Sequence, residues 1–230
     1  MEDLKTLKTS IGLQLQRFLD KPDIKREERE LPFRSFMHLL LLDLAFAGLL
    51  TAFLHLLGID KSAYHRFDME LFKKLPILFF IGGVIVAPFF EEYLFRYFLD
   101  YRTKTLTIST IMLFLVFVMA FDRSSPFDNA IYFFSFSFVL TMLLLKQLYN
   151  FRSPKMLVWG SIICFGLFHI TNYHSDAYAH NILLIPFLVA PQLIGGFFLA
   201  FIRTQYRFIH CVMFHAAFNA VIFIFTLATL

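Results

Sequence analysis

The chain has few charged residues and almost no cysteine. Charged side chains make up 17% of its 230 residues, and there are 2 cysteines and 1 tryptophan. So little charge excludes an ordinary soluble domain. Cys164 and Cys211 lie far apart in apolar stretches. They form neither a disulfide framework nor a metal-ligand pair, and we expect them to fill the core.

Apolar residues are abundant instead, at 58% of the chain with 33 phenylalanines. This composition predicts an all-α, polytopic integral membrane helix bundle. We expect seven transmembrane helices, at Ser35–Leu57, Leu75–Asp100, Leu106–Phe121, Ala130–Tyr149, Met156–Tyr173, Ile182–Ile202 and Phe208–Leu230. The sequence shows no internal repeat or second domain, so residues 35–230 are expected to form one transmembrane domain.

We expect residues 1–34 to form a separate, more polar, cytoplasmic or interfacial amphipathic segment without a cleavable signal peptide. Its apolar residues recur at helical spacing, at Leu4, Leu7, Ile11, Leu15 and Phe18. Two interpretations fit this stripe equally well. The helix lies in the membrane interface, or it packs on the cytoplasmic ends of the bundle.

The basic residues predict the orientation of the chain. With a cytoplasmic N-terminus, most of the 21 Lys and Arg lie on the inner side, among them Arg96, Arg102, Lys104, Lys146, Arg152, Lys155, Arg203 and Arg207. The outer side keeps Lys61, Arg66, Lys73, Lys74 and Arg123. We therefore expect a multi-pass protein of the cell membrane. Its net charge of +4 suits anionic membrane lipids, and nothing indicates nucleic-acid binding.

The second apolar stretch contains two adjacent acids, Glu91 and Glu92. An ionisable residue at this depth costs about 2.5 to 3.5 kcal/mol, so it indicates a functional site. Later stretches add His169 and the pair His215 and Asn219. At a rise of about 1.5 Å per residue, Glu91, His169 and His215 lie roughly 15, 21 and 12 Å from the inner surface. The first stretch also contains an acid, Asp43, which marks an interhelical contact or a proton path; we prefer the contact.

Spacing suggests different roles for the two glutamates. Glu92 and Arg96 stand at i and i+4, where an acid and a base on a helix meet, so Arg96 is expected to hold Glu92 ionised in a supporting role. Glu91 points about 100° away around the helix, without a cation of its own, and is expected to act as a general base. His169 would orient the water or carry a proton. His215 and Asn219 would donate hydrogen bonds to an oxyanion.

These residues form three motifs in order along the chain. The motifs are EExxxR at Glu91–Arg96, FxxxH at Phe165–His169 and HxxxN at His215–Asn219. Together they resemble the CPBP family of intramembrane endopeptidases, which includes type II CAAX prenyl proteases and bacteriocin-processing or immunity proteins. The resemblance covers roughly residues 75–224.

The resemblance implies hydrolysis of peptide bonds in a peptide or protein substrate, including a lipidated one. By the matched positions, Glu91 and His169 would activate water, while His215 and Asn219 would stabilise the oxyanion. The spacing does not decide whether a metal takes part, because the HExxH zinc pattern is absent, and we favour metal-free catalysis. If the reaction uses Zn²⁺ instead, Glu91, His169 and His215 are the expected ligands.

Two other classes of protein use similar residues. A proton-coupled transporter would show internal repeats with matching broken spans, which the sequence lacks. A non-catalytic membrane adaptor or bacteriocin-immunity protein would retain the fold without turnover. This second class is the alternative to the endopeptidase.

Overall fold

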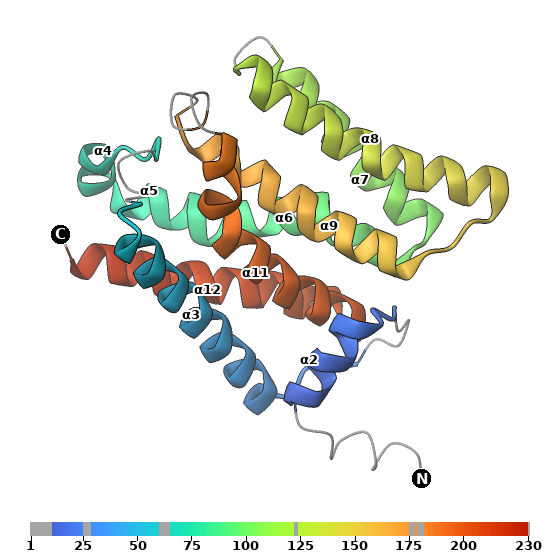
Figure 1. The fold of residues 1–230 in the computed structure, drawn as a ribbon, viewed down its shortest axis with the longest axis horizontal. Coiled ribbons are helices and arrows are strands. Elements are labelled where there is room, and N and C mark those ends of the chain that lie inside the picture. Colours follow the sequence, from blue (N-terminus) through green and yellow to red (C-terminus); the bar gives the residue numbers. More distant parts are fainter. Residues whose placement is uncertain are drawn as a thin grey trace.

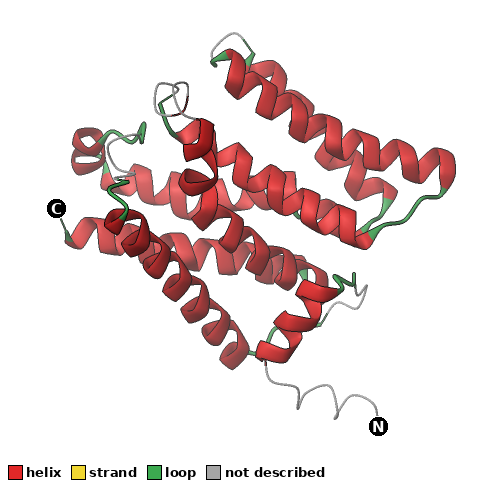
Figure 2. Cartoon of the chain, viewed as in Figure 1, coloured by secondary structure: helices red, strands yellow, loops and turns green. Residues whose placement is uncertain are grey.

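A computed structural model describes residues 11–24, 29–59, 65–121, 124–174, 178 and 182–229. Five residues of the sequence-based predictions lie outside this part, namely Leu4, Leu7, Lys61, Arg123 and Leu230. The described residues form helices and loops without a β-strand, apart from an isolated bridge between His65 and Tyr173 (Figure 2). The all-α prediction is therefore confirmed.

Seven helices are long and apolar enough to cross a membrane in the described part of the chain. They are α3 (Phe33–Leu56), α5–η2–α6 (Pro76–Phe95), α7 (Thr103–Ala120), α8 (Pro126–Tyr149), α9–η4 (Pro154–Asn172), η5–α11 (Ile182–Gln205) and α12 (Phe208–Ala228). Each coincides with a predicted span, with ends displaced by a few residues. The prediction of a multi-pass membrane protein is confirmed.

Local sequence signals set several of these helix ends. Ser125 and Ser153 cap α8 and α9, where each side chain accepts a hydrogen bond from a backbone N–H of the first turn. A proline follows each serine at the first helical position, where its missing N–H costs nothing. Asn150 ends α8 in the left-handed conformation with φ of 49°. These turns join neighbouring spans over short distances.

The spans form a layered bundle (Figure 1). Helices α7 and α8 pack on each other along one side, and α3 lies against α11 on the other. Between them α11 packs on both α9 and α12, and α12 contacts η2 and α6. The helices that carry the three motifs, α6, α9 and α12, therefore meet in the interior.

The N-terminal helix α2 (Ile11–Asp20) packs on the bundle. Phe18 is buried, with its ring 5.6 Å from that of Phe197 and 5.4 Å from that of Phe201 in α11. Farther on, Gln205 donates a hydrogen bond to the Asp23 carbonyl at 2.9 Å. The described part of the apolar stripe therefore packs on α11 through Phe18. Whether this helix also lies in the membrane interface stays a prediction.

At the end of the bundle opposite α2, side chains from two loops form hydrogen bonds with Asp128 in the first turn of α8. The Asp128 carboxylate is fully buried, and it accepts hydrogen bonds from Arg66 at 3.2 Å and from the Tyr178 hydroxyl at 2.9 Å. Burial, together with the neighbouring Asp128, raises the pKa of Tyr178 to about 12. The Arg66 N–H also donates to the Asn172 carbonyl at 2.8 Å. This contact fixes η4 (His169–Asn172), the short 3₁₀ segment that carries His169.

Candidate active site

The helix that carries the two glutamates begins with an irregular turn. Residues Ile81–Val86 form the π-helical segment η2, in which the Ala87 N–H bonds to the Gly82 carbonyl five residues back. The next donor in this pattern would be Pro88, which has no N–H, so the Gly83 carbonyl lacks a backbone partner. Asn219 replaces that partner, because its side-chain amide donates to Gly83 O at 2.9 Å. One amide hydrogen of the predicted oxyanion residue is thus used to hold η2 against α12.

The other end of α6 (Ala87–Phe95) is held by side chains from three neighbouring helices. The helix ends at Phe95, and the carbonyls of its last turn lose their helical donors. Side chains donate to two of them, Ser109 to Tyr93 O at 2.7 Å and Ser161 to Phe95 O at 2.5 Å. Arg203 donates to the next carbonyl, Arg96 O, at 3.2 Å, alongside the Leu99 N–H at 3.0 Å. The glutamate-bearing helix is therefore fixed at both ends by tertiary contacts.

Glu92 is fully buried and has several partners. The predicted contact with Arg96 is present, with Arg96 Nε 4.0 Å from Glu92 Oε2. Two further donors come from α12: His215 Nδ1 lies 2.8 Å from Glu92 Oε1, and the Cys211 thiol donates to Oε2 at 2.8 Å. Cys211 is therefore a hydrogen-bond donor rather than simple core filler. No sequence pattern indicates this contact, because the two residues lie 119 positions apart on different helices.

Arg96 is also fully buried and occupies a narrow space between α9 and α11. Its guanidinium carbon lies 3.8 Å from the centre of the Phe165 ring, and its Nη2 donates to the Gly196 carbonyl at 3.4 Å. A methyl group on Gly196 would lie 3.0 Å from Arg96 Nη2 and 3.2 Å from Phe165. The missing side chain of Gly196 therefore leaves the space that the Arg96 side chain occupies.

Glu91 faces two imidazoles. Its Oε2 lies 3.5 Å from His169 Nε2 and 3.7 Å from His215 Nε2, too far for strong hydrogen bonds. His169 Nδ1 lies 2.8 Å from the Phe165 carbonyl, and because a carbonyl only accepts, this nitrogen carries the hydrogen. The same reasoning gives His215 an Nδ1–H that donates to Glu92. In the neutral form of each ring, Nε2 is then an acceptor beside the Glu91 carboxylate.

A cavity of about 430 Å³ adjoins these groups. Four predicted site residues line it, namely Glu91, His169, His215 and Asn219. Glu92 and Arg96 lie behind this wall. Three further polar side chains border the same space, Asp43 from α3, Asn172 from η4 and Gln192 from α11.

Asp43 lies at a contact between two helices, as preferred from the sequence, but its carboxylate finds no donor there. It lies against α11 beside Gly195, where a Cβ atom would be 3.7 Å from Asp43 Oδ2. Its Oδ1 is buried and accepts no hydrogen bond. Gln192 was missed as a site residue, because one polar residue in a span gives no indication of the direction it faces. Asp43 could be recognised from the sequence as an unusual residue, because acids are rare in membrane spans.

The described residues hold no group of three His, Cys, Asp or Glu side chains arranged to bind a metal ion. Zinc binding by Glu91, His169 and His215 stays a prediction from the sequence.

Comparison with known proteins agrees with the arrangement of these motifs. The family described as type II CAAX prenyl endopeptidase Rce1-like matches residues 73–221, which include η2, α6, α9, α11 and most of α12. No curated protein and no solved structure matches the chain. Because the family match covers well over half of the sequence and all three motifs, the chain belongs to the Rce1-like family of type II CAAX prenyl endopeptidases.

Proposed function

We propose that this protein is an intramembrane endopeptidase that hydrolyses peptide bonds with a water molecule activated by Glu91 and His169. The observation that carries the proposal is the buried Glu91 Oε2, which has no hydrogen-bond partner and lies between two imidazole Nε2 atoms beside the cavity. A carboxylate in this setting accepts a proton from water in the cavity. His169 Nε2 offers a second acceptor that orients the same water.

His215 and Asn219 are the proposed oxyanion donors. Glu92 accepts a hydrogen bond from His215 Nδ1, and its negative charge stabilises an imidazolium at this position. The protonated ring then donates from Nε2 toward the cavity. The Asn219 amide has a second hydrogen that is not used in its bond to Gly83 O, and this hydrogen donates to the oxyanion.

A lipidated peptide is the substrate that the neighbouring surface favours. An apolar cavity of about 550 Å³ lies between the outer halves of α5–η2 and α12, within the size range of ligand sites. Phe72, Phe79 and Phe223 contribute aromatic walls. It shares Gly83, Asn219 and Ile222 with the site cavity, so a lipid tail held there would place its attached peptide beside Glu91.

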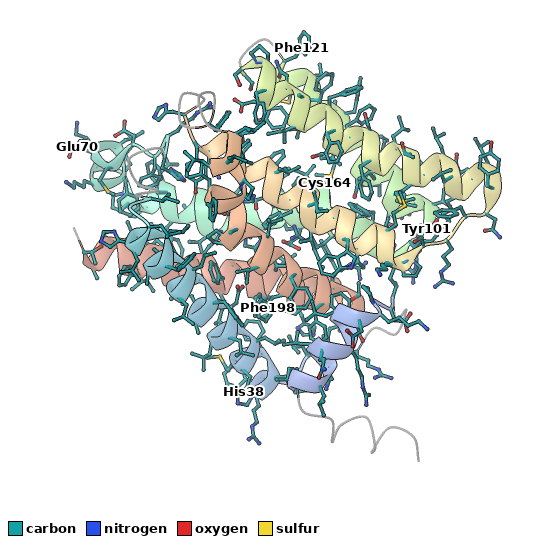
Figure 3. All side chains as sticks on the ribbon, in the orientation of Figure 1. His38, Glu70, Tyr101, Phe121, Cys164 and Phe198 are labelled. Atoms are coloured by element: carbon teal, nitrogen blue, oxygen red, sulfur yellow. The ribbon has the colours of Figure 1, made fainter. Side chains whose placement is uncertain are left out.

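The proposed orientation puts the N-terminus in the cytoplasm. Arg207 bonds Glu30, Lys146 bonds the Tyr101 carbonyl, and Arg203 lies 3.6 Å from Asp100. These basic residues gather at the end of the bundle where α2 packs and where Tyr101 is labelled in Figure 3. The positive-inside rule assigns that end to the cytoplasm.

Cleavage of fluorogenic peptides by the purified, detergent-solubilised protein tests the proposal. Prenylated and unprenylated peptides are compared, with and without chelator, for wild type and Glu91→Gln. We expect turnover that survives the chelator, prefers the prenylated peptide and falls by at least about 100-fold in the variant. Loss of turnover on chelation would replace the metal-free mechanism with one in which Glu91, His169 and His215 bind Zn²⁺. No turnover by folded wild type would favour the adaptor or immunity alternative.

A further inference from the structure

Three buried oxygen atoms border the site cavity without a hydrogen-bond partner. They are Asp43 Oδ1, Glu91 Oε2 and Gln192 Oε1. The described residues contain only two other buried side-chain oxygens in this condition, on Asn129 and Ser135, and neither lines this cavity. The unpaired acceptors are therefore concentrated at one place in the molecule.

Asp43 and Gln192 stand apart from the water-activating groups. Asp43 comes from α3 and Gln192 from α11, whereas Glu91 and the two histidines come from α6, η4 and α12. Only 2% of Asp43 is exposed, and no described Lys, Arg or His forms an ion pair with it. An acid buried at this depth without a partner carries a large desolvation cost. The chain itself provides nothing in the described residues that offsets this cost.

The chemistry of this wall defines what would bind there. When Asp43 is ionised, its carboxylate only accepts hydrogen bonds, as does the Gln192 amide oxygen, so a ligand that pairs with both oxygens is a donor. A carboxylate in a low-dielectric setting is best matched by a donor that is also positively charged. A lysine ammonium has three donor hydrogens and an arginine guanidinium has five, which is enough for both oxygens at once.

We propose that Asp43 and Gln192 form a specificity subsite that receives a basic side chain, Lys or Arg, of the peptide substrate. This inference rests on the proposed endopeptidase function and names a feature of its substrate. The ammonium or guanidinium group of the peptide pairs with Asp43 and donates to Gln192 Oε1. The scissile bond then lies toward Glu91 across the same cavity.

Matched peptides that differ only in one side chain test this subsite. Each peptide contains lysine or its neutral isostere norleucine at one position near the scissile bond, and the readout is the ratio of kcat/KM for the two. For wild type we expect a ratio of at least about tenfold at one position, since that corresponds to about 1.4 kcal/mol. Asp43→Asn should reduce the ratio to nearly one, because the amide is isosteric but uncharged. Gln192→Glu, which adds a second carboxylate, should raise it.

Thr51→Ala is the matched control on the same helix, since Thr51 is exposed and its hydroxyl bonds back to the Ala47 carbonyl. It should leave the wild-type ratio unchanged. A wild-type ratio near one at every position, or an unchanged ratio in Asp43→Asn, overturns the subsite. If Asp43→Asn fails to fold, Gln192→Glu decides, and a ratio that does not rise overturns it.

A binding measurement separates this inference from the proteolytic function. If wild type cleaves no peptide, the proposed function fails, and fluorescence anisotropy with Glu91→Gln still tests the subsite. Glu91→Gln should bind the lysine peptide at least about tenfold more tightly than the norleucine peptide, and adding Asp43→Asn should abolish this difference. Equal binding of both peptides by Glu91→Gln overturns the subsite whatever the fate of the protease.

Discussion

Two regions of the bundle bury carboxylates in opposite ways. Both oxygens of the Glu92 carboxylate accept a hydrogen bond from α12, one from Cys211 and one from His215, and Arg96 lies nearby on the same chain segment with two of its own nitrogens unbonded. The cavity wall buries Asp43 and Glu91 with oxygens that accept no hydrogen bond. Burial costs a similar desolvation free energy in both regions, so the difference lies in the compensation of the carboxylates. A saturated carboxylate holds helices together, whereas an unsaturated one is suited to binding a group from outside the chain.

The largest expected effect comes from removing the saturated Glu92 carboxylate. Glu92→Gln removes the negative charge and leaves Arg96 buried without a counter-ion, which should destabilise the protein by about 3 to 5 kcal/mol. Activity should fall together with stability. Thermal unfolding in detergent, followed alongside peptide cleavage, measures both.

Glu70→Gln is the matched control, since Glu70 is an exposed acid that pairs with Lys73 at 3.3 Å. It should change stability by less than about 0.5 kcal/mol. By contrast, Glu91→Gln in the cavity should abolish turnover with little change in unfolding temperature. If Glu92→Gln were as stable and active as wild type, the distinction between the two regions would be lost.

A smaller effect is expected from filling the space beside Arg96. Gly196→Ala places a methyl group 3.0 Å from Arg96 Nη2 and 3.2 Å from Phe165, two groups that are themselves tightly packed. Overpacking of this kind costs about 1 to 3 kcal/mol. The same thermal unfolding experiment measures it.

Gly48→Ala provides the comparison, because Gly48 lies in α3 with nothing within 4 Å of an added Cβ. It should leave stability unchanged or raise it by at most about 1 kcal/mol through helix propensity. Equal unfolding temperatures for the two alanine variants would show that Arg96 is not confined by Gly196.

A third effect tests the role of Asn219 at the π-helical turn. Asn219→Ala leaves Gly83 O without its donor beside an apolar cavity at membrane depth, where water does not replace it, and should cost about 1 to 3 kcal/mol. In a Pro88→Ala background, residue 88 regains an N–H that can bond Gly83 O. The stability cost of Asn219→Ala should then shrink by at least about 0.5 kcal/mol.

Activity provides the second readout of this double-mutant cycle. If Asn219 also donates to the oxyanion, Pro88→Ala restores stability to Asn219→Ala without restoring turnover. An identical stability cost in both backgrounds would mean that Gly83 O and Asn219 are not coupled.

The smallest effect concerns the exposed N-terminal attachment. Glu30 bonds Arg207 and also His210 Nε2, at 2.7 Å from the latter. These two bonds, Arg207 first, lower the pKa of Glu30 from its ordinary value of 4.5. A lowered carboxyl pKa stabilises the folded state above pH 4.5, and this contribution is lost as the pH falls through the lowered value.

Hydrogen exchange measures this attachment at the Arg207 amide, which donates to the Arg29 carbonyl at 3.1 Å. After correction for the intrinsic rate, wild type should lose protection below pH 4.5. Glu30→Gln should have the lower protection already at pH 6 and show little further change. Equal protection of both proteins at pH 6 would argue against the ion pair.

Spacing along the sequence was sufficient for features within one helix. It gave the seven spans, because long apolar runs must be helical where lipid offers no hydrogen bonds. It also gave the contact between Glu92 and Arg96, because residues four apart on a helix lie on one face. The family likewise followed from three motifs on the second, fifth and seventh spans.

Spacing was insufficient for contacts between helices. His215 was expected to serve the oxyanion alone, but it also bonds Glu92, and Cys211 donates to the same carboxylate. The bond from Asn219 to Gly83 exists because a proline five residues later leaves that carbonyl free. These pairings depend on how α12 is rotated and shifted against η2 and α6, which no single-helix pattern records.

The sequence by itself determined that this chain is a membrane-embedded helix bundle with acids, imidazoles and an arginine at similar depths. Hydrophobic length and helical periodicity are local properties, so they can be read without a fold. Only the tertiary structure decided which carboxylate is saturated and which faces a cavity. That outcome depends on the packing of helices far apart in the chain. Rotating one helix would turn a carboxylate from its hydrogen-bond partners toward the open cavity.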